Sequence, residues 1–169
     1  MTFDDIDGHM AIDFVRNVFR FVDEQMLNLE ALIGQDMRSE GDSGLFGHAD
    51  YFAGMGFVAG QRYITSVCGL LKLRKREALA LGPEFISAVS YASLINASAN
   101  YWKHSDEWDF EKLNDLQKAT KIVIESAGVT VGATELVAYN VFHQFKLPGF
   151  KELLPVLTTW SNAVSNSVV

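Results

Sequence analysis

Apolar residues recur every three or four positions along the first third of the chain, which is the spacing of one helical face. The row comprises Ile12, Val15, Phe19, Val22, Met26, Leu29 and Ile33. Charged and amide side chains occupy the opposite face, and Gly34 follows the last apolar position as a natural helix end. The pattern predicts a long first helix that buries one side against its neighbours.

Residues 35–47 are rich in glycine and polar side chains, so we expect a flexible loop there. A second helix is predicted from His48 to about residue 81. We expect a bend near Gly69, because a straight helix of this length would be longer than the other helices. Its first half carries small residues at three- and four-residue steps, which favour close backbone packing: Ala49, Ala53, Gly56 and Gly60.

Residues 85–102 carry no charged side chain over 18 positions, which is typical of a buried element. They predict a third helix at about 84–104, central in the fold and opened by Pro83. Further helices are predicted from about Asp109, from about Thr134 and over 150–165, and residues 161–169 are expected to fray. Together these patterns predict one all-α domain over residues 1–169, an up-and-down bundle of five or six helices.

The composition narrows the classes of partner. The net charge of −7 argues against a general coating of nucleic acid or membrane on the surface. Cys68 is the only cysteine, which fits a reducing, cytoplasmic setting. No stretch is apolar over about 18 residues, so we expect no membrane partner.

Asn96, Asn100 and His104 stand four residues apart on the predicted third helix and therefore share one face. Because an unpaired buried amide costs roughly 1–3 kcal/mol, these side chains need partners. The line is therefore either a structural network or a functional site.

The spacing Asn100-x-x-x-His104 resembles the active-site signature of the HEPN superfamily. Its members are small α-helical bundles, many of them metal-independent ribonucleases of toxin–antitoxin and phage-defence systems. Their motif commonly reads Arg-Asn-x-x-x-His, whereas Ala99 stands at the arginine position here. The resemblance implies that His104 and Asn100 are catalytic, with His104 as general acid or base. Because alanine cannot stabilise phosphate charge, it also implies a non-catalytic member, or another arginine that substitutes.

The surrounding residues predict the substrate contacts of such a site: Asn96, Tyr101, Trp102, Lys103 and Trp108. Aromatic rings stack on bases for roughly 1–3 kcal/mol each, although ordinary packing is the alternative reading for these rings. The one basic cluster, residues 72–76, would lie about 40 Å from His48 along a continuous second helix, too far to serve His104 within one protomer.

Three histidines suggest a different chemistry. In an antiparallel bundle, His48, His104 and His143 would all fall at the same end, where imidazoles suit zinc or another divalent metal. No His-x-x-x-His pair supports this metal site. The expectation is therefore no cofactor, with a divalent metal as the alternative.

Three hypotheses remain open. The leading one is a non-enzymatic helical binding or interaction module, of the kind found in bacterial stress or defence operons, with a protein partner and with the Asn96–Asn100–His104 line purely structural. The second is a HEPN-like ribonuclease or RNA-binding protein that uses His104, and the third is a metal-binding protein. A homodimer is also predicted, because the first two helices carry extra aromatic residues: Phe14, Phe21, Phe52 and Phe57.

Overall fold

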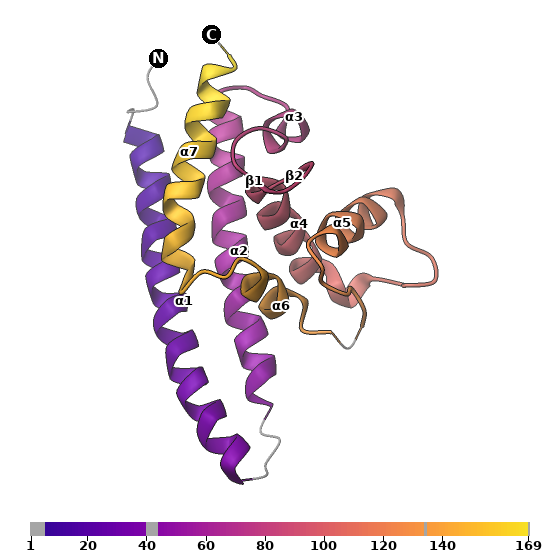
Figure 1. Ribbon diagram of the computed structural model, residues 1–169. Coiled ribbons are helices and arrows are strands. Elements are labelled where there is room, and N and C mark those ends of the chain that lie inside the picture. The colour runs from indigo at the N-terminus through magenta and orange to yellow at the C-terminus, as the bar shows by residue number, and fades with distance from the viewer. Residues whose placement is uncertain (1–5, 40–43, 134, 169) are drawn as a thin grey trace.

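The structure, a computed structural model, describes residues 6–39, 44–133 and 135–168. Within these ranges the chain forms seven α-helices, two short 3₁₀ helices and one two-stranded hairpin (Figure 1). The predicted all-α fold class is confirmed. In the described part of the chain, no helix combines the length and apolar character needed to cross a bilayer.

Two long antiparallel helices dominate the molecule, α1 (Ile6–Ser39) and α2 (Leu45–Leu70) (Figure 1). The predicted apolar row of α1 is confirmed, since Val15, Phe19 and Val22 are fully buried or nearly so. The predicted end at Gly34 is wrong, because α1 continues through it to Ser39; a Cβ at Gly34 would meet nothing within 4 Å.

The loop expected at 35–47 is therefore wrong at both ends. Residues 35–39 belong to α1, α2 begins at Leu45, and residues 40–43 lie outside the described residues. The glycines and polar side chains of this segment suggested a loop, but helical pairing of α1 with α2 outweighs their weak helix propensity.

Small residues of α2 permit close packing, as predicted. A Cβ at Gly56 would lie 2.5 Å from the Phe150 ring, and one at Gly60 would lie 2.9 Å from Ile95. These glycines let α2 approach both α4 and the chain segment before α7.

The second helix stops at Leu70 rather than continuing to residue 81. Lys72 adopts a left-handed φ of 53°, and the amides of Lys72 and Leu73 bond the carbonyls of Gly69 and Cys68 at 3.2 and 2.9 Å. This is the Schellman arrangement that ends helices, with lysine where glycine is usual. The chain then reverses into α3 (Lys75–Leu79).

A hairpin replaces the start of the predicted third helix. Strands β1 (Glu84–Ile86) and β2 (Val89–Ser90) pair antiparallel, and α4 (Tyr91–His104) follows. The Ser90 side chain accepts from the Ser93 amide at 2.9 Å and fixes this later start. Helix α4 packs against α2 on one side and α5 on the other, which gives it the inner place expected.

The fourth predicted helix also begins later. A 3₁₀ turn (Ser105–Glu107) and a loop precede α5 (Asp115–Ser126), whose start is set by a capping box between Asn114 and Gln117. Asp109, the predicted start, accepts instead from the amide of Glu111 within the loop.

Helix α6 (Val137–Gln144) follows, and Thr134, its predicted start, lies outside the described residues. A second 3₁₀ turn (Phe150–Glu152) leads into α7 (Leu153–Asn166). The Asp23 carboxylate of α1 accepts from the amides of Phe150 and Lys151 at 2.5 and 3.1 Å. These bonds tie the start of the last helix to the first one.

The frayed tail predicted from residue 161 is wrong up to residue 166, because α7 continues and buries Ser161 and Val164. Just before them, Trp160 is fully buried and its Nε1 donates to the carbonyl of Ala78 at 2.9 Å. The last helix therefore holds α3 in place.

Candidate functional site

Four polar side chains form a hydrogen-bonded chain between α2 and α4, which we call the polar relay: Gln61, Asn96, Asn100 and Lys103. The Gln61 Nε2 donates to Asn100 Oδ1 at 2.7 Å, to Asn96 Oδ1 at 3.0 Å and to the Asn96 carbonyl at 3.3 Å. The Lys103 ammonium donates to Gln61 Oε1 at 2.7 Å. Asn96 and Asn100 thus have the buried partner that their position required.

Gln61 is the residue that sequence reasoning missed. It is only 6% exposed, and its neighbours on the inner face of α2, Phe57 and Ile64, are fully buried. A single amide within an apolar row was the available signal, because a buried amide needs a partner as much as Asn96 and Asn100 do.

His104 does not join the relay. Its side chain is 53% exposed, and in the described part of the chain its one side-chain partner is Glu107, with Nδ1 and Oε1 3.4 Å apart. The predicted line of three residues therefore divides into two relay members and one solvent-facing imidazole.

Two joined hollows lie between α4 and α5. The narrower one, of about 260 Å³, is lined by Asn100, His104 and Trp108 together with residues of the loop and α5. The wider one, of about 770 Å³, extends from Asn100 past Asn96 to α3. Asn100, Leu116 and Thr120 line both, so we treat them as one feature, the α4–α5 groove.

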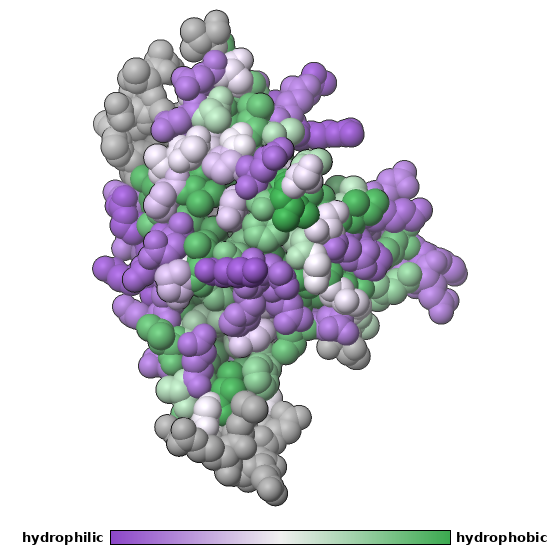
Figure 2. Space-filling view, viewed as in Figure 1, coloured by the Kyte–Doolittle hydropathy of each residue, from purple (hydrophilic) through white to green (hydrophobic). Residues whose placement is uncertain are grey.

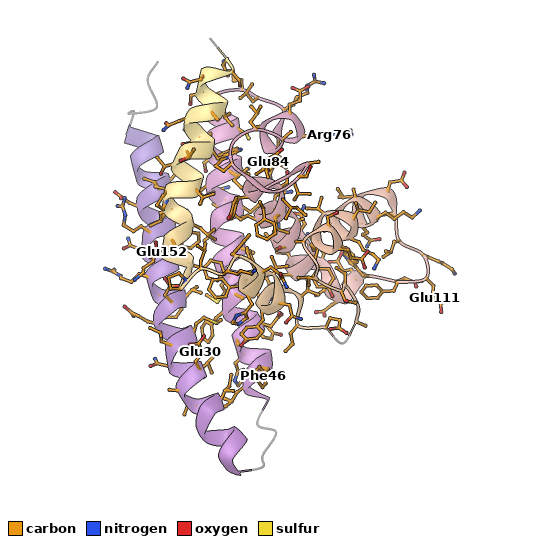
Figure 3. The ribbon with its side chains drawn as sticks, viewed as in Figure 1. Glu30, Phe46, Arg76, Glu84, Glu111 and Glu152 are labelled. Carbon is orange, nitrogen blue, oxygen red and sulfur yellow. The ribbon has the colours of Figure 1, made fainter. Side chains whose placement is uncertain are left out.

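The basic residues of α3 reach this groove. Lys75 and Arg76 line its wider part, and Figure 3 shows Arg76 on α3, on the side of the long helix pair that also carries α4 and α5. The expectation that the basic cluster lies too far from the His104 end assumed a continuous second helix. The chain instead reverses at Lys72, so Lys75 and Arg76 line the wide hollow while His104 lines the narrow one.

Lys75 is held close to the relay. Its ammonium donates to Thr65 Oγ1 of α2 at 3.1 Å. Burial lowers the pKa of Lys75, the Cys68 thiol acts in the opposite sense, and the positive charge of Lys103 lowers it further. Two ammonium groups therefore stand near enough to repel each other beside the polar residues of α4.

The three aromatic side chains predicted as substrate contacts lie in different places. Trp108 lines the narrow hollow and meets Tyr101 edge to face at 5.0 Å. Tyr101 itself is buried and its hydroxyl donates to the Gly132 carbonyl at 2.9 Å, while burial raises its pKa to about 12. Trp102 lines a different, apolar hollow beside Phe14 of α1. Of the three rings, Trp108 alone borders the groove.

The three histidines are not gathered into a metal site. His48 is exposed near the start of α2, and His143 is exposed on α6, where it packs against Tyr139 at 4.3 Å. Among residues 6–39, 44–133 and 135–168, no group of three or more His, Cys, Asp or Glu side chains is arranged to hold a metal ion.

No protein-family model, curated protein or solved structure matches this chain. The HEPN resemblance thus rests on Asn100 and His104 alone. At the position of the family's arginine, Ala99 is fully buried in the core, and the nearest cation along α4 is Lys103, one turn further on.

Proposed function

We propose that the protein is a non-enzymatic helical binding module and that the α4–α5 groove holds its ligand. The observation that carries this proposal is the groove itself. Its wide hollow, of about 770 Å³, is of the size of small-molecule sites, and the narrow one of about 260 Å³ adjoins it. Four of the predicted site residues line the two hollows: Asn96, Asn100, His104 and Trp108.

The surface around the groove agrees with a binding role. Figure 2 shows hydrophilic side chains over the outer side of α5, with hydrophobic surface between them and the long helices. Leu79, Ala97, Leu116, Ala119 and Val123 supply the apolar part of the wide hollow. Apolar walls with a few converging polar groups are the usual composition of a ligand site.

Two features favour binding over catalysis. The oxygens of Asn96 and Asn100 are engaged by Gln61, which suits a fixed framework. The exposed imidazole of His104 has Glu107 as a loose partner at 3.4 Å, and Ala99 places no cation beside it. Transition-state stabilisation requires donors held where charge develops, and position 99 supplies none.

Nuclear magnetic resonance of the ¹⁵N-labelled protein with a library of small aromatic and anionic fragments tests the proposal. We expect the amide shifts of binding fragments to cluster on residues that line the groove. Ala119→Trp, which fills the wide hollow from α5, should abolish them, whereas Ile122→Trp, at a 63% exposed position outside the groove, should not. Shifts centred on another surface, or binding that survives Ala119→Trp, would overturn the proposal.

The second candidate is the HEPN-like ribonuclease. Asn100 and His104 line the same narrow hollow, and Lys103 lies between them in sequence, which favours this reading over the metal-binding one. Wild-type protein should then cleave RNA in the presence of a chelator, and His104→Ala should lose the activity while His143→Ala keeps it. RNA left intact by the wild type contradicts this candidate.

The assembly we propose is a homodimer through the α1–α2 apolar face, a surface made by Phe14, Val18, Phe21, Tyr51, Phe52, Met55, Val58 and Trp102. Part of it forms an apolar hollow of about 430 Å³. Phe57, which also motivated the dimer, is fully buried and belongs to the core instead.

The area of this face suits a second copy of the chain. Phe14, Phe21, Tyr51 and Met55 are between 39% and 66% exposed. Half of a large side chain is roughly 100 Å², so these four contribute about 400 Å². With the half-buried members beside them, the face approaches the roughly 800 Å² per partner of a stable interface.

Light scattering across micromolar concentrations checks the dimer. We expect the wild type to sediment and scatter as a dimer and Phe14→Glu to become monomeric. Leu27→Glu, at an exposed apolar position on the other side of α1, serves as the control and should remain dimeric. A monomeric wild type would contradict the assembly.

A further inference from the structure

We propose that the α4–α5 groove takes a phosphate-bearing ligand of nucleotide size, with the phosphate at the α3 end among Lys75, Arg76 and the amide groups of Asn96 and Asn100. This inference rests on the proposed function and names the chemical class of the ligand. Its basis is the direction in which the polar relay turns its amides.

Lys103 fixes that direction. An ammonium group can only donate, so the Gln61 oxygen must face Lys103, as the 2.7 Å bond shows. The NH₂ group of Gln61 then faces α4, where it donates to the side-chain oxygens of Asn96 and Asn100. Both asparagines consequently turn their oxygens toward Gln61 and their own NH₂ groups away from it.

The two asparagines therefore offer NH₂ donors to the groove. Asn96 and Asn100 both border it, and the side-chain bonds that they receive from Gln61 end on their oxygens. Thr120, only 6% exposed, lines both hollows, and its hydroxyl can donate to a ligand oxygen as well as accept. Such donors suit a ligand whose polar atoms are oxygens that accept.

The charges at the α3 end agree. Lys75 and Arg76 line the wide hollow, and within the described ranges neither has a carboxylate at ion-pair distance. The one acid that lines this hollow, Asp115, is fully exposed and lies 3.9 Å from Lys118. Cations and amide donors around one hollow form the usual environment of a bound phosphate.

The rest of the groove fits the remainder of a nucleotide. Leu116 and Val123 give the wide hollow an apolar wall, and Trp108 lines the narrow hollow that joins it at Asn100. A ring system attached to the phosphate would lie along these side chains. A nucleoside phosphate meets this requirement either as a free nucleotide or as one unit of a single strand.

Calorimetric titration with adenosine monophosphate (AMP), and with adenosine as the neutral comparator, tests the inference. We expect AMP to bind at least tenfold more tightly than adenosine. Lys75→Met and Arg76→Met should each weaken AMP binding about tenfold, the loss of one charged hydrogen bond, and leave adenosine unchanged. Lys112→Met removes the same charge at an exposed position that lines neither hollow and should change neither.

Lys103→Met tests the relay. Without the ammonium, Gln61 is free to reverse its amide, and the AMP preference over adenosine should fall toward unity while Lys112→Met retains it. Thermal unfolding of each variant establishes that the fold is intact. A tightly binding oligouridylate with weak AMP would assign the phosphate to a strand rather than a free nucleotide and still support the inference.

The outcomes separate this inference from the proposed function. If AMP and adenosine bind equally and Ala119→Trp abolishes both, the groove is a ligand site but the phosphate assignment is overturned. Absence of binding by AMP and by oligouridylate at millimolar concentration also overturns it. If AMP binds undiminished in Ala119→Trp, the proposed function itself fails.

Discussion

Gly56 lies in the middle of α2, and an alanine Cβ there would stand 2.5 Å from the Cε1 atom of Phe150. Whether Phe150 can move aside decides the effect of Gly56→Ala. Phe150 is fully buried, and its ring packs against Phe19 at 5.5 Å, Phe57 at 5.2 Å and Phe142 at 4.6 Å. With rings on three sides, it has no open direction in which to shift.

Two opposing terms set the magnitude. Alanine is a better helix former than glycine by up to about 1 kcal/mol. Overpacking a filled core costs typically 1–3 kcal/mol, and a contact at 2.5 Å with an immobile ring belongs at the upper end. We therefore expect Gly56→Ala to lower the free energy of unfolding by about 1–2 kcal/mol.

Gly69 provides the matched control, because it lies in the same helix and a Cβ there would meet nothing within 4 Å. Gly69→Ala should raise the free energy of unfolding by about 0.5–1 kcal/mol. Urea unfolding followed by circular dichroism measures both variants. If Gly56→Ala proved as stable as Gly69→Ala, the close approach of α2 to Phe150 would be refuted.

Three further predictions concern the relay, a buried acid and a helix cap. Gln61→Leu should lower the free energy of unfolding by about 1–3 kcal/mol, because the relay loses its centre, and an unchanged melting temperature would contradict the relay. Burial raises the pKa of Asp50 above its ordinary value of 3.8, although its carboxylate accepts from the Tyr139 amide at 2.9 Å. The native state therefore loses stability as pH rises from 3.8 through the raised pKa; Asp50→Asn should remove this loss, and parallel urea-midpoint profiles for the two proteins from pH 3 to 8 would refute it. Asn114→Ala removes the side chain that accepts from the Gln117 amide in the α5 capping box, and it should lower the free energy of unfolding in urea by about 0.5–2 kcal/mol. An unchanged free energy of unfolding would contradict the observed helix start.

Periodicity predicted the parts of the fold in which side chains alternate regularly between core and solvent. The α1 row and the small residues of α2 are of this kind. The end of α2 was not predictable in the same way, because Lys72 takes the left-handed position that glycine usually occupies. Gly69, the apparent breaker, lies within the last helical turn.

The hairpin before α4 was missed for a related reason. Strands of three and two residues are too short to show an alternating pattern, and an uncharged run suits a buried helix equally well. The turn between them depends on Ala88 with a φ of 65°, a conformation that alanine rarely adopts and that its presence in a sequence therefore does not predict.

The sequence showed that the polar residues of the candidate site need hydrogen bonds, but it did not show which residue supplies them. The desolvation cost of Asn96 and Asn100 required hydrogen bonds, yet the donor Gln61 comes from 35 and 39 residues earlier in the chain. Contacts across that separation depend on how α2 and α4 cross, which local patterns do not encode. The same limit applied to Lys75 and Arg76, whose place depends on the reversal after α2.

The bond from Trp160 to the Ala78 carbonyl makes the proposed ligand binding depend on how much of the chain has been synthesised. Helix α3, which supplies the cationic end of the groove, is translated long before α7, the helix that holds it. A nascent chain that stops short of Trp160 has every groove residue but lacks the hydrogen bond that holds α3, the helix that carries Lys75 and Arg76. Under the proposed function, the groove would bind only after translation has passed α7, so truncated products should not compete with the full chain for a ligand.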